Sequence, residues 1–265
     1  MNGLLTLAAF GSAAAIALVM TPRFVRRLGR TLLVATAAPG LKHGEPRFGR
    51  VDPAAFAGPD LARANALRAP GASRAAKRVF DLVAAILLLV IFAPLLLVTA
   101  IAIRLDSPGP SLYRQRRVGQ DGRIFEIYKF RSMRTDAEKN GAQWASTGDD
   151  RITRIGRIIR RTRIDEIPQA LNILKGEMSF VGPRPERPEF VTLLDKDIPH
   201  YDDRHLVKPG ITGWAQVRHS YTASIDGARE KLCYDLFYVK HFSLLLDVLI
   251  VLMTVRVAVL GIGSR

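Results

Sequence analysis

The chemistry of this chain centres on two adjacent carboxylates, Asp165 and Glu166, which lie between a run of arginines and a Gly-Pro-Arg-Pro turn. Paired carboxylates can act as a nucleophile or as ligands of a hard metal cation. Arg160, Arg161 and Arg163 precede the pair. We expect their charges to lower the pKa of both carboxyl groups and to hold an anionic substrate. The alternative is a helix-capping aspartate with solvated salt bridges around it.

A short helix is predicted to carry the pair. Between 164 and 174 apolar residues recur at helical spacing, whereas Asp165, Gln169 and Asn172 fall on the opposite face. Pro168 places the carboxylates at a helix start or a break, where free amides favour a bound phosphate. We therefore expect a half-buried helix. Its expected apolar face consists of Ile164, Ile167, Leu171 and Leu174.

The composition favours an anionic partner. The 265 residues include 39 Lys+Arg against 24 Asp+Glu, a formal net charge of +15. Such a chain suits nucleic acid, acidic lipid or a phosphorylated substrate. Aromatic residues are not interleaved with the basic ones, and no zinc-finger or RNP pattern occurs, so we expect no nucleic-acid partner. The single cysteine, Cys233, excludes an intrachain disulfide and fits a reducing compartment.

The first apolar block predicts a membrane anchor. Residues 4–20 are almost wholly apolar and are followed by four arginines, so the far end of the block is expected to be cytoplasmic. A cleaved signal peptide is the alternative, but it would carry its positive charge before the apolar run. We assign 1–34 to an N-terminal transmembrane anchor with a basic flank. The Ala-, Pro-, Gly- and Arg-rich segment 35–75 is predicted to be a flexible linker.

A second apolar block covers 79–103, contains Pro94 and has basic residues at both ends. A spanning helix would place one basic cluster outside the cell, against the usual charge bias. A helix, break and helix that enters and leaves by the same face satisfies both flanks. From the residues alone, a spanning helix with a proline kink is an equal alternative.

Other segments are expected to complete the domain. Alternating apolar residues within 112–131 predict a small strand or hairpin. Segment 152–161 predicts a helix with isoleucines on one face and arginines on the other, suited to a membrane interface. The apolar run 242–260, interrupted by Asp247 and Arg256, is open to three interpretations: spanning, buried or interfacial.

Six sequence blocks occur in order between residues 76 and 265. Together they resemble the bacterial sugar transferases, the monotopic polyprenyl-phosphate phosphoglycosyl transferases. The YDLFYVK variant is similar to the exopolysaccharide branch found beside exosortase-type systems. The blocks are KRVFDLVAAILLLVIFAPLLL, SPGPSLYRQRRVG, YKFRSMRTDA, RRTRIDEIPQALNILKGEMSFVGPRPE, VKPGITGWAQV and YDLFYVKHFSLLLD.

The resemblance implies transfer of a phosphosugar from a UDP-sugar to undecaprenyl phosphate, with release of UMP, which initiates exopolysaccharide repeat-unit assembly. Family members use an Asp-Glu pair with Mg²⁺. Asp165 would then be the nucleophile that becomes a transient acyl phosphate, and Glu166 would assist in metal binding or positioning. Both carboxylates are the implied metal ligands.

The resemblance also implies substrate-binding residues. Arg160 and Arg184 match family positions linked to substrate binding, and Pro183 and Pro185 shape the turn that presents Arg184. Many members carry an arginine in an Asn-Gly-Arg-Asn segment after GWAQV that has no direct match here, and Arg218 is the candidate replacement.

For the membrane segment, the resemblance implies that 79–103 is re-entrant, with Lys77 and Arg78 at lipid headgroups. Many members have Ser-Pro at the break, whereas this chain has Ala93-Pro94, so no serine hydroxyl can satisfy the freed backbone.

The predicted architecture is α+β and mostly helical. It comprises the anchor, the re-entrant helix and interfacial amphipathic helices on a transferase domain of residues 76–265. Within that domain we expect a catalytic core at 104–240 and a C-terminal apolar helix at 242–260. The domain is expected on the cytoplasmic face of the bacterial inner membrane, and a homodimer is left open. The alternative is a non-enzymatic basic membrane adaptor that binds anionic lipid or a partner protein.

Overall fold

The computed structural model describes residues 49–53, 56, 64, 70–139, 141, 148–219 and 224–260 of the chain, with the backbone alone for 257–260. The anchor predicted for 1–34 lies outside these residues. The helices are α5 (Gly71–Asp106), α6 (Arg154–Arg161), α7 (Ala170–Lys175), α8 (Pro188–Asp197), α9 (Trp214–Arg218), α10 (Ile225–Lys240) and α11 (Leu244–Leu260), with the 3-10 turns η2 (Gln120–Gly122), η3 (Ile164–Gln169) and η4 (Tyr201–Leu206). The strands are β1 (Leu112–Val118), β2 (Ile124–Phe130), β3 (Ser179–Val181) and β4 (Gly210–Thr212).

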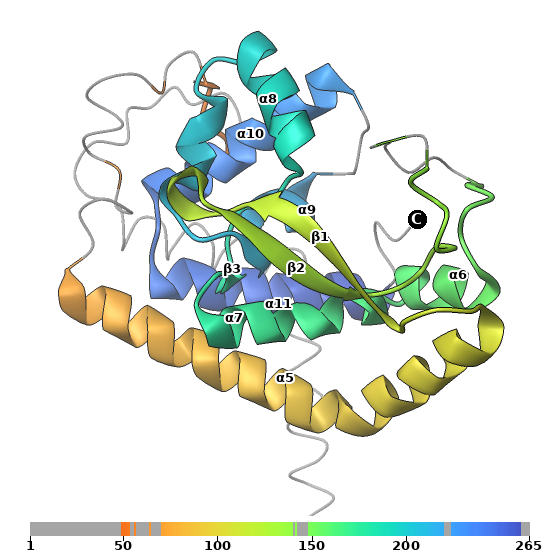
Figure 1. Cartoon of the computed structure of the whole chain (residues 1–265). Helices are drawn as coiled ribbons and strands as arrows, with labels where there is room; N and C mark the ends of the chain where they lie inside the picture. Colours follow the sequence, from red (N-terminus) through yellow and green to blue (C-terminus); the bar gives the residue numbers. More distant parts are fainter. Residues whose placement is uncertain are drawn as a thin grey trace, which may run out of the picture.

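The described part of the chain is mostly helical, as predicted, with two small sheets (Figure 1). β1 and β2 form the expected antiparallel hairpin, in a register that pairs Leu112 with Phe130 and Val118 with Ile124. β3 and β4 are parallel and lie side by side. The helix predicted at 152–161 is present as α6, and the Thr153 side chain caps it by accepting a hydrogen bond from the Gly156 amide at 2.9 Å.

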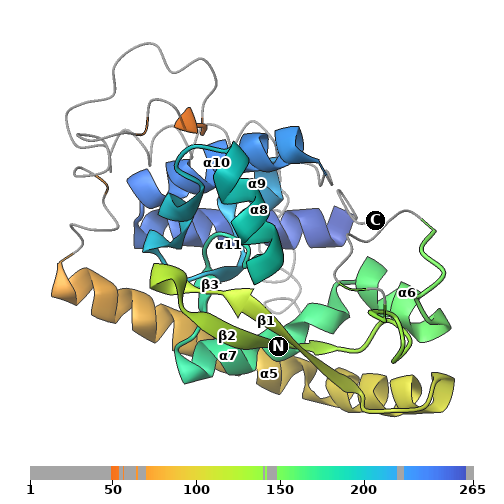
Figure 2. The same cartoon turned by 45° about the horizontal axis from the view of Figure 1, so that its top comes forward.

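The second apolar block is one long helix, α5. Among the described residues it is the one helix long and apolar enough to cross a membrane. Figures 1 and 2 show α5 along the lower edge of the molecule, with a bend toward its yellow C-terminal end. The other labelled elements lie above it in Figure 1. Proline removes a helical hydrogen bond, and Pro94 lies inside this helix. The outward face of α5 leaves large apolar side chains uncovered, among them Val79, Ile86, Val90, Ile91, Leu97 and Ile101.

The expectation that Lys77 lies at lipid headgroups is wrong, whereas that for Arg78, which is half-buried, stays a prediction. Lys77 is buried, and its Nζ atom lies 2.8 Å from Asp81 Oδ1 and 3.0 Å from Asp247 Oδ2. Arg78 donates hydrogen bonds to the carbonyls of Ile173 and Leu174 at the end of α7. A buried charge requires a partner. The two basic residues therefore fasten the start of α5 to the domain.

The run 242–260 forms α11, which packs one face into the main core. Leu246, Leu249, Ile250 and Met253 are buried there, and Asp247 is fully buried with its Oδ1 atom accepting a hydrogen bond from Tyr238 Oη at 2.7 Å. The charge that interrupts the apolar run is thus neutralised within the protein by Lys77. The opposite face exposes Leu245, Val248 and Val255.

The prediction of a flexible linker over 35–75 does not hold for its described residues. Val51, Phe56 and Ala64 are buried in the main core. The Gly49 carbonyl accepts a hydrogen bond from Trp214 Nε1 at 2.8 Å, and the Val51 amide donates to the Cys233 carbonyl at 2.9 Å. The pattern missed this contact because isolated apolar residues within an Ala/Pro/Gly segment show no periodicity. α5 itself begins at Gly71, inside the predicted linker.

The segment 164–174 is helical, but the predicted face is wrong. The 3-10 turn η3 carries Pro168 and leads into α7. Gln169 and Asn172 are buried, whereas Leu171 is 38% exposed. Asn172 extends the edge of the hairpin: its Oδ1 atom accepts from the Tyr128 amide at 3.0 Å and its Nδ2 atom donates to the Glu126 carbonyl at 2.6 Å. Two satisfied backbone groups account for the burial of this polar side chain.

His241 makes the stability of the fold depend on pH. Burial, assisted by Lys240, lowers its pKa from 6.5 to about 4, and its ring packs on Phe237 with centroids 4.4 Å apart. Between these two pKa values the unfolded chain binds a proton that the folded chain does not. The contribution of His241 to the free energy of unfolding, about 3 kcal/mol, is therefore fully present above pH 6.5 and is lost as the pH falls toward 4. We expect His241→Phe to reduce the dependence of the unfolding temperature on pH between 6.5 and 4, with part of it kept by His205, whose pKa burial lowers to about 3. An unchanged slope would contradict the assignment.

Candidate active site

The two carboxylates lie at the start of η3 and are both buried. Asp165 is 8% exposed and Glu166 is 7% exposed. The turn begins after Arg163, whose φ of 61° is left-handed although it is not a glycine. Such backbone costs about 1–3 kcal/mol and is retained where the surrounding structure fixes it, often at functional sites. The abrupt change of direction sets both side chains against the hairpin, since β2 packs on η3.

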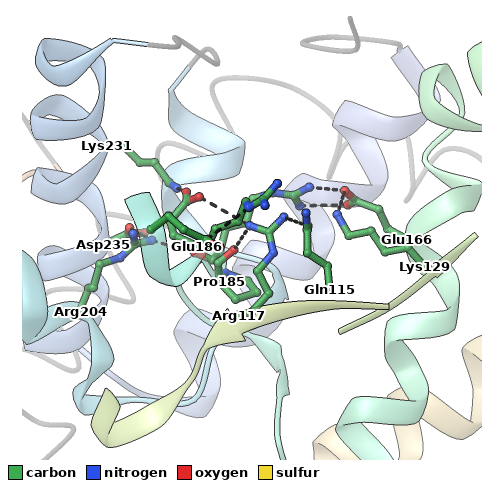
Figure 3. Close-up of polar contacts among 12 residues, drawn as sticks. Gln115, Arg117, Lys129, Glu166, Pro185, Glu186, Arg204, Lys231 and Asp235 are labelled. Carbon is green, nitrogen blue, oxygen red and sulfur yellow. Dashed lines mark hydrogen bonds and ion pairs between the residues drawn. The ribbon is translucent and has the colours of Figure 1, made fainter. Parts of the chain in front are cut away.

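Glu166 is held by three cations. Arg184 donates to both of its oxygens, with Nη1 to Oε2 at 3.0 Å, and the second hydrogen bond joins Nη2 to Oε1. Lys129 Nζ lies 3.6 Å from Oε1, and Arg163 Nη1 lies 3.8 Å from Oε2. Figure 3 shows Lys129 beside Glu166. The bidentate pair fixes the direction of the guanidinium as well as its distance.

Their surroundings shift the pKa values of the two carboxyl groups in opposite directions. Burial acts to raise the pKa of Glu166, but Arg184 and Lys129 outweigh it, so that pKa lies well below its usual range. Burial, together with the charge of Glu166, raises the pKa of Asp165 from 3.8 to about 6. The predicted lowering is therefore right for Glu166 and wrong for Asp165. In both cases the cations with the largest effect are Lys129 and Arg184, not the three arginines before the pair.

Asp165 is the available carboxylate. Its Oδ1 atom is buried with no hydrogen-bond partner among the described residues. A buried, unsatisfied oxygen costs free energy, and such groups in native structures commonly mark a catalytic role or an absent ligand. A carboxylate that is ionised at neutral pH but more basic than usual is a better nucleophile than an ordinary aspartate.

Lys129 is a site residue that the sequence interpretation did not single out. Burial lowers its pKa from 10.5 to about 8, although the charge of Glu166 opposes the change. In β2 it shares the strand face of Phe125 and Ile127, because side chains two apart point the same way. A lysine on the apolar face of a predicted strand was the signal that could have found it.

The turn after β3 carries Arg184 between Pro183 and Pro185. Arg117 Nη1 donates to the Pro185 carbonyl at 3.0 Å, and Arg204 Nη2 donates to the Arg184 carbonyl at 2.8 Å. Lys231 and Glu186 are half-buried beside this turn, and Lys231 Nζ lies 2.5 Å from Glu186 Oε1. Figure 3 shows them together with Arg117, Pro185 and Arg204. Burial opposes the charges of Lys231, Arg204 and Arg117, which nevertheless lower the pKa of Glu186 to about 2.

The other predicted site residues are Arg160 and Arg218. Arg160 is half-buried on α6, and its charge opposes the rise in the pKa of Asp165. Arg218 is exposed at the end of α9, where its guanidinium lies 5.2 Å from the centre of the Trp214 ring. The described contact of Arg218 is thus with Trp214.

The site offers carboxylate oxygens to a metal ion but no complete protein cage. Within the described ranges, no group of three or more His, Cys, Asp or Glu side chains could hold one. Mg²⁺ commonly takes one or two carboxylates and completes its shell with substrate phosphates and water. The unpartnered Oδ1 atom of Asp165 fits that role. Both oxygens of Glu166 are engaged by Arg184.

A buried carboxylate with an oxygen that has no described hydrogen-bond partner, beside a cluster of fixed cations, suits phosphoryl chemistry, in which positioning and charge stabilisation supply most of the catalysis. The family profile described as "Bacterial sugar transferase" matches residues 72–261. The chain therefore belongs to the bacterial sugar transferase family.

Individual relatives agree with this assignment. The chain is 53% identical over 189 residues to a UDP-N-acetylgalactosamine-undecaprenyl-phosphate N-acetylgalactosaminephosphotransferase of Aeromonas hydrophila, covering 71% of this chain and 45% of that protein. It is 47% identical over 181 residues to a UDP-glucose:undecaprenyl-phosphate glucose-1-phosphate transferase of Caulobacter vibrioides, covering 68% of each. It is 44% identical over 185 residues to the exopolysaccharide production protein PSS of Rhizobium leguminosarum bv. phaseoli, covering 68% of this chain and 92% of that protein. The match thus spans less than half of the first relative.

Proposed function

We propose that the protein transfers a sugar 1-phosphate from a UDP-sugar to undecaprenyl phosphate, releases UMP and so initiates exopolysaccharide assembly. The names of the relatives support the two substrates. The observation that carries the proposal is the difference between the contacts of the two carboxylates. Glu166 is locked by Arg184 and Lys129, whereas Asp165 keeps a buried oxygen without a partner.

The proposed reaction has two displacements at one phosphorus atom. A carboxylate oxygen of Asp165 attacks the sugar-bearing phosphorus, the bond to the bridging oxygen breaks, and UMP leaves with that oxygen. An oxygen of undecaprenyl phosphate then attacks the acyl phosphate, and Asp165 is regenerated as the carboxylate. Lys129 and Arg184 stabilise the negative charge on the phosphoryl oxygens, with Glu166 holding both cations in place.

Arg160 is assigned to substrate binding because its charge reaches Asp165. Asp165 is the residue that would hold Mg²⁺, and a bound Mg²⁺ would supply positive charge that offsets the repulsion between a carboxylate and an anionic substrate. The engaged oxygens of Glu166 favour positioning of the cations over direct ligation, although the pair remains the predicted metal site.

We assign the domain to one face of the bacterial inner membrane, the cytoplasmic one, because a UDP-sugar is a cytoplasmic substrate. The two ends of α5 support a re-entrant path. Lys77 ties the first end to Asp247, and Asp106 Oδ2 accepts a hydrogen bond from the Ile155 amide at 3.0 Å at the other end. A straight helix of 36 residues would separate its ends by roughly 54 Å. Here both ends attach to the same body.

The membrane path predicts a labelling result. With Cys233 replaced by serine, single cysteines introduced as Arg74→Cys and Arg104→Cys should react with a membrane-impermeant thiol reagent from the cytoplasmic side only. Both positions are exposed near opposite ends of α5. Labelling of the two from opposite sides would show a spanning helix instead.

The reaction is tested by nucleoside monophosphate release. Protein in native-like membranes receives undecaprenyl phosphate, Mg²⁺ and a panel of UDP-sugars, and release that requires the lipid names the donor. If no donor supports release by folded protein, the adaptor alternative replaces the enzymatic one.

A further inference from the structure

Four successive carbonyls of the turn that carries Arg184 are each held by a hydrogen bond from elsewhere in the chain. The Gly210 amide donates to Pro183 O at 2.9 Å, and the Val118 amide donates to Glu186 O at 2.9 Å. Between them, Arg204 holds Arg184 O at 2.8 Å and Arg117 holds Pro185 O at 3.0 Å. Backbone from β4 and β1 and side chains from η4 and β1 therefore fix this turn.

Gly182 and Gly210 bring the backbones beside this turn into close contact. A Cβ atom added to Gly182 would lie 2.3 Å from the Lys208 carbonyl oxygen, and one added to Gly210 would lie 2.1 Å from the Gly182 nitrogen. The two backbones are in direct contact. A small displacement of the turn is thus resisted on the β3–β4 side, and the side facing η4 depends on Arg204.

Arg204 is buried and is itself oriented by two partners. It is 2% exposed, its Nη2 atom forms an ion pair with Asp235 Oδ2 at 2.8 Å, and its Nη1 atom donates to Tyr201 Oη at 2.6 Å. Removing two charges from water costs about as much as their attraction returns, so a buried pair is weak evidence for a role in stability. The guanidinium of Arg204 contacts the turn at the main-chain carbonyl of Arg184. Arg184 is the residue whose side chain holds Glu166.

We propose that Arg204, oriented by Asp235, is a positioning residue for the transfer reaction, an inference that rests on the proposed function. It touches no reacting atom. It fixes the main chain at Arg184, and thereby the place of the Arg184 guanidinium against Glu166 and the transferred phosphoryl group. A misplacement of about 1 Å at a catalytic group can cost about 100-fold in rate.

The test uses Arg204→Lys in the full chain. The lysine keeps the charge opposite Asp235, but a single ammonium cannot reproduce the forked contacts to Arg184 O, Asp235 and Tyr201. We expect the lipid-dependent transfer rate at saturating donor to fall at least tenfold, with the unfolding temperature within about 4 °C of the wild type. The matched control is Arg229→Lys on the exposed face of α10, which should leave the rate unchanged.

A second variant guards against loss of folding. Arg204→Met combined with Asp235→Leu removes both charges of the pair at once, a change that buried pairs often tolerate. We expect this variant to fold and to lose at least as much rate as Arg204→Lys. A folded variant of either kind with the wild-type rate would overturn the proposal.

A double-mutant comparison separates positioning from a general structural effect. In an Arg184→Lys background, where the bidentate contact to Glu166 is already lost, Arg204→Lys should cost less than about twofold. An equal loss in both backgrounds would show that Arg204 does not act through Arg184. Absence of turnover by the wild-type protein would instead refute the proposed function and would leave the rate comparison without a reference.

Discussion

Asp165→Asn should abolish lipid-dependent transfer, lowering the rate by at least about 10⁴-fold, because removal of a covalent nucleophile costs this order of rate in comparable enzymes. Asparagine keeps the shape of the side chain but loses the charge and the nucleophilic oxygen. Glu166 is not a substitute, since both its oxygens are bound by Arg184. Nucleoside monophosphate release measures the loss.

The control for this change is Asp150→Asn, an exposed aspartate elsewhere in the chain. We expect it to retain the wild-type rate. The unfolding temperature of Asp165→Asn should not fall, because the substitution removes a buried charge whose Oδ1 atom has no hydrogen-bond partner among the described residues, and burial disfavours that charge. Retention of more than a few per cent of the rate by Asp165→Asn would contradict its role as the nucleophile.

Arg184→Ala is expected to have the second largest effect, on both stability and rate. It removes the bidentate partner of Glu166, whose side chain is 9% exposed. Lys129 and Arg163 remain at 3.6 and 3.8 Å without a hydrogen bond to it. Loss of one member of a buried pair costs about 3–5 kcal/mol, and loss of a fixed donor to the transition state costs about 100- to 1000-fold in rate.

The measurements are chemical denaturation in detergent and transfer at saturating donor. The matched control, Arg116→Ala, removes an exposed arginine of β1 and should change neither. A stable Arg184→Ala variant with the wild-type rate would show that the ion pair with Glu166 is dispensable.

Sequence reasoning singled out the two carboxylates that we propose react, but it did not predict their electrostatics. Adjacent Asp165 and Glu166 are recognisable from their order along the chain. The pKa of Asp165 rises because folding buries it beside Glu166, and the pKa of Glu166 falls because of Lys129 and Arg184. These two cations are 36 and 19 positions away from Asp165 and meet the dyad only after folding. The three neighbouring arginines were a reasonable source of charge, but two of them lie on α6, and their effects on the two pKa values are smaller than those of Lys129 and Arg184.

Tertiary contacts also reversed several local expectations. Helical spacing at 164–174 indicated the right element, but the buried face is decided by Asn172, which satisfies two backbone groups of β2. Lys77 precedes an apolar block and so indicated a headgroup contact. Its carboxylate partner Asp247 is 170 residues away, and neither residue is recognisable from sequence as half of a buried pair. Burial of Val51 in the main core, with its amide bonded to the Cys233 carbonyl of α10, was equally invisible to periodicity.

The central claim is that Asp165 carries the sugar phosphate, and intact-mass spectrometry tests it most directly. Protein is incubated with Mg²⁺ and the UDP-sugar that supports turnover, without undecaprenyl phosphate, and is then denatured rapidly. We predict a mass increase of one sugar phosphate, located at Asp165 by peptide mapping, absent from Asp165→Asn and discharged when the lipid is added before quenching. Adduct formation on another residue, or lipid-dependent turnover by Asp165→Asn at the wild-type rate, would contradict the account.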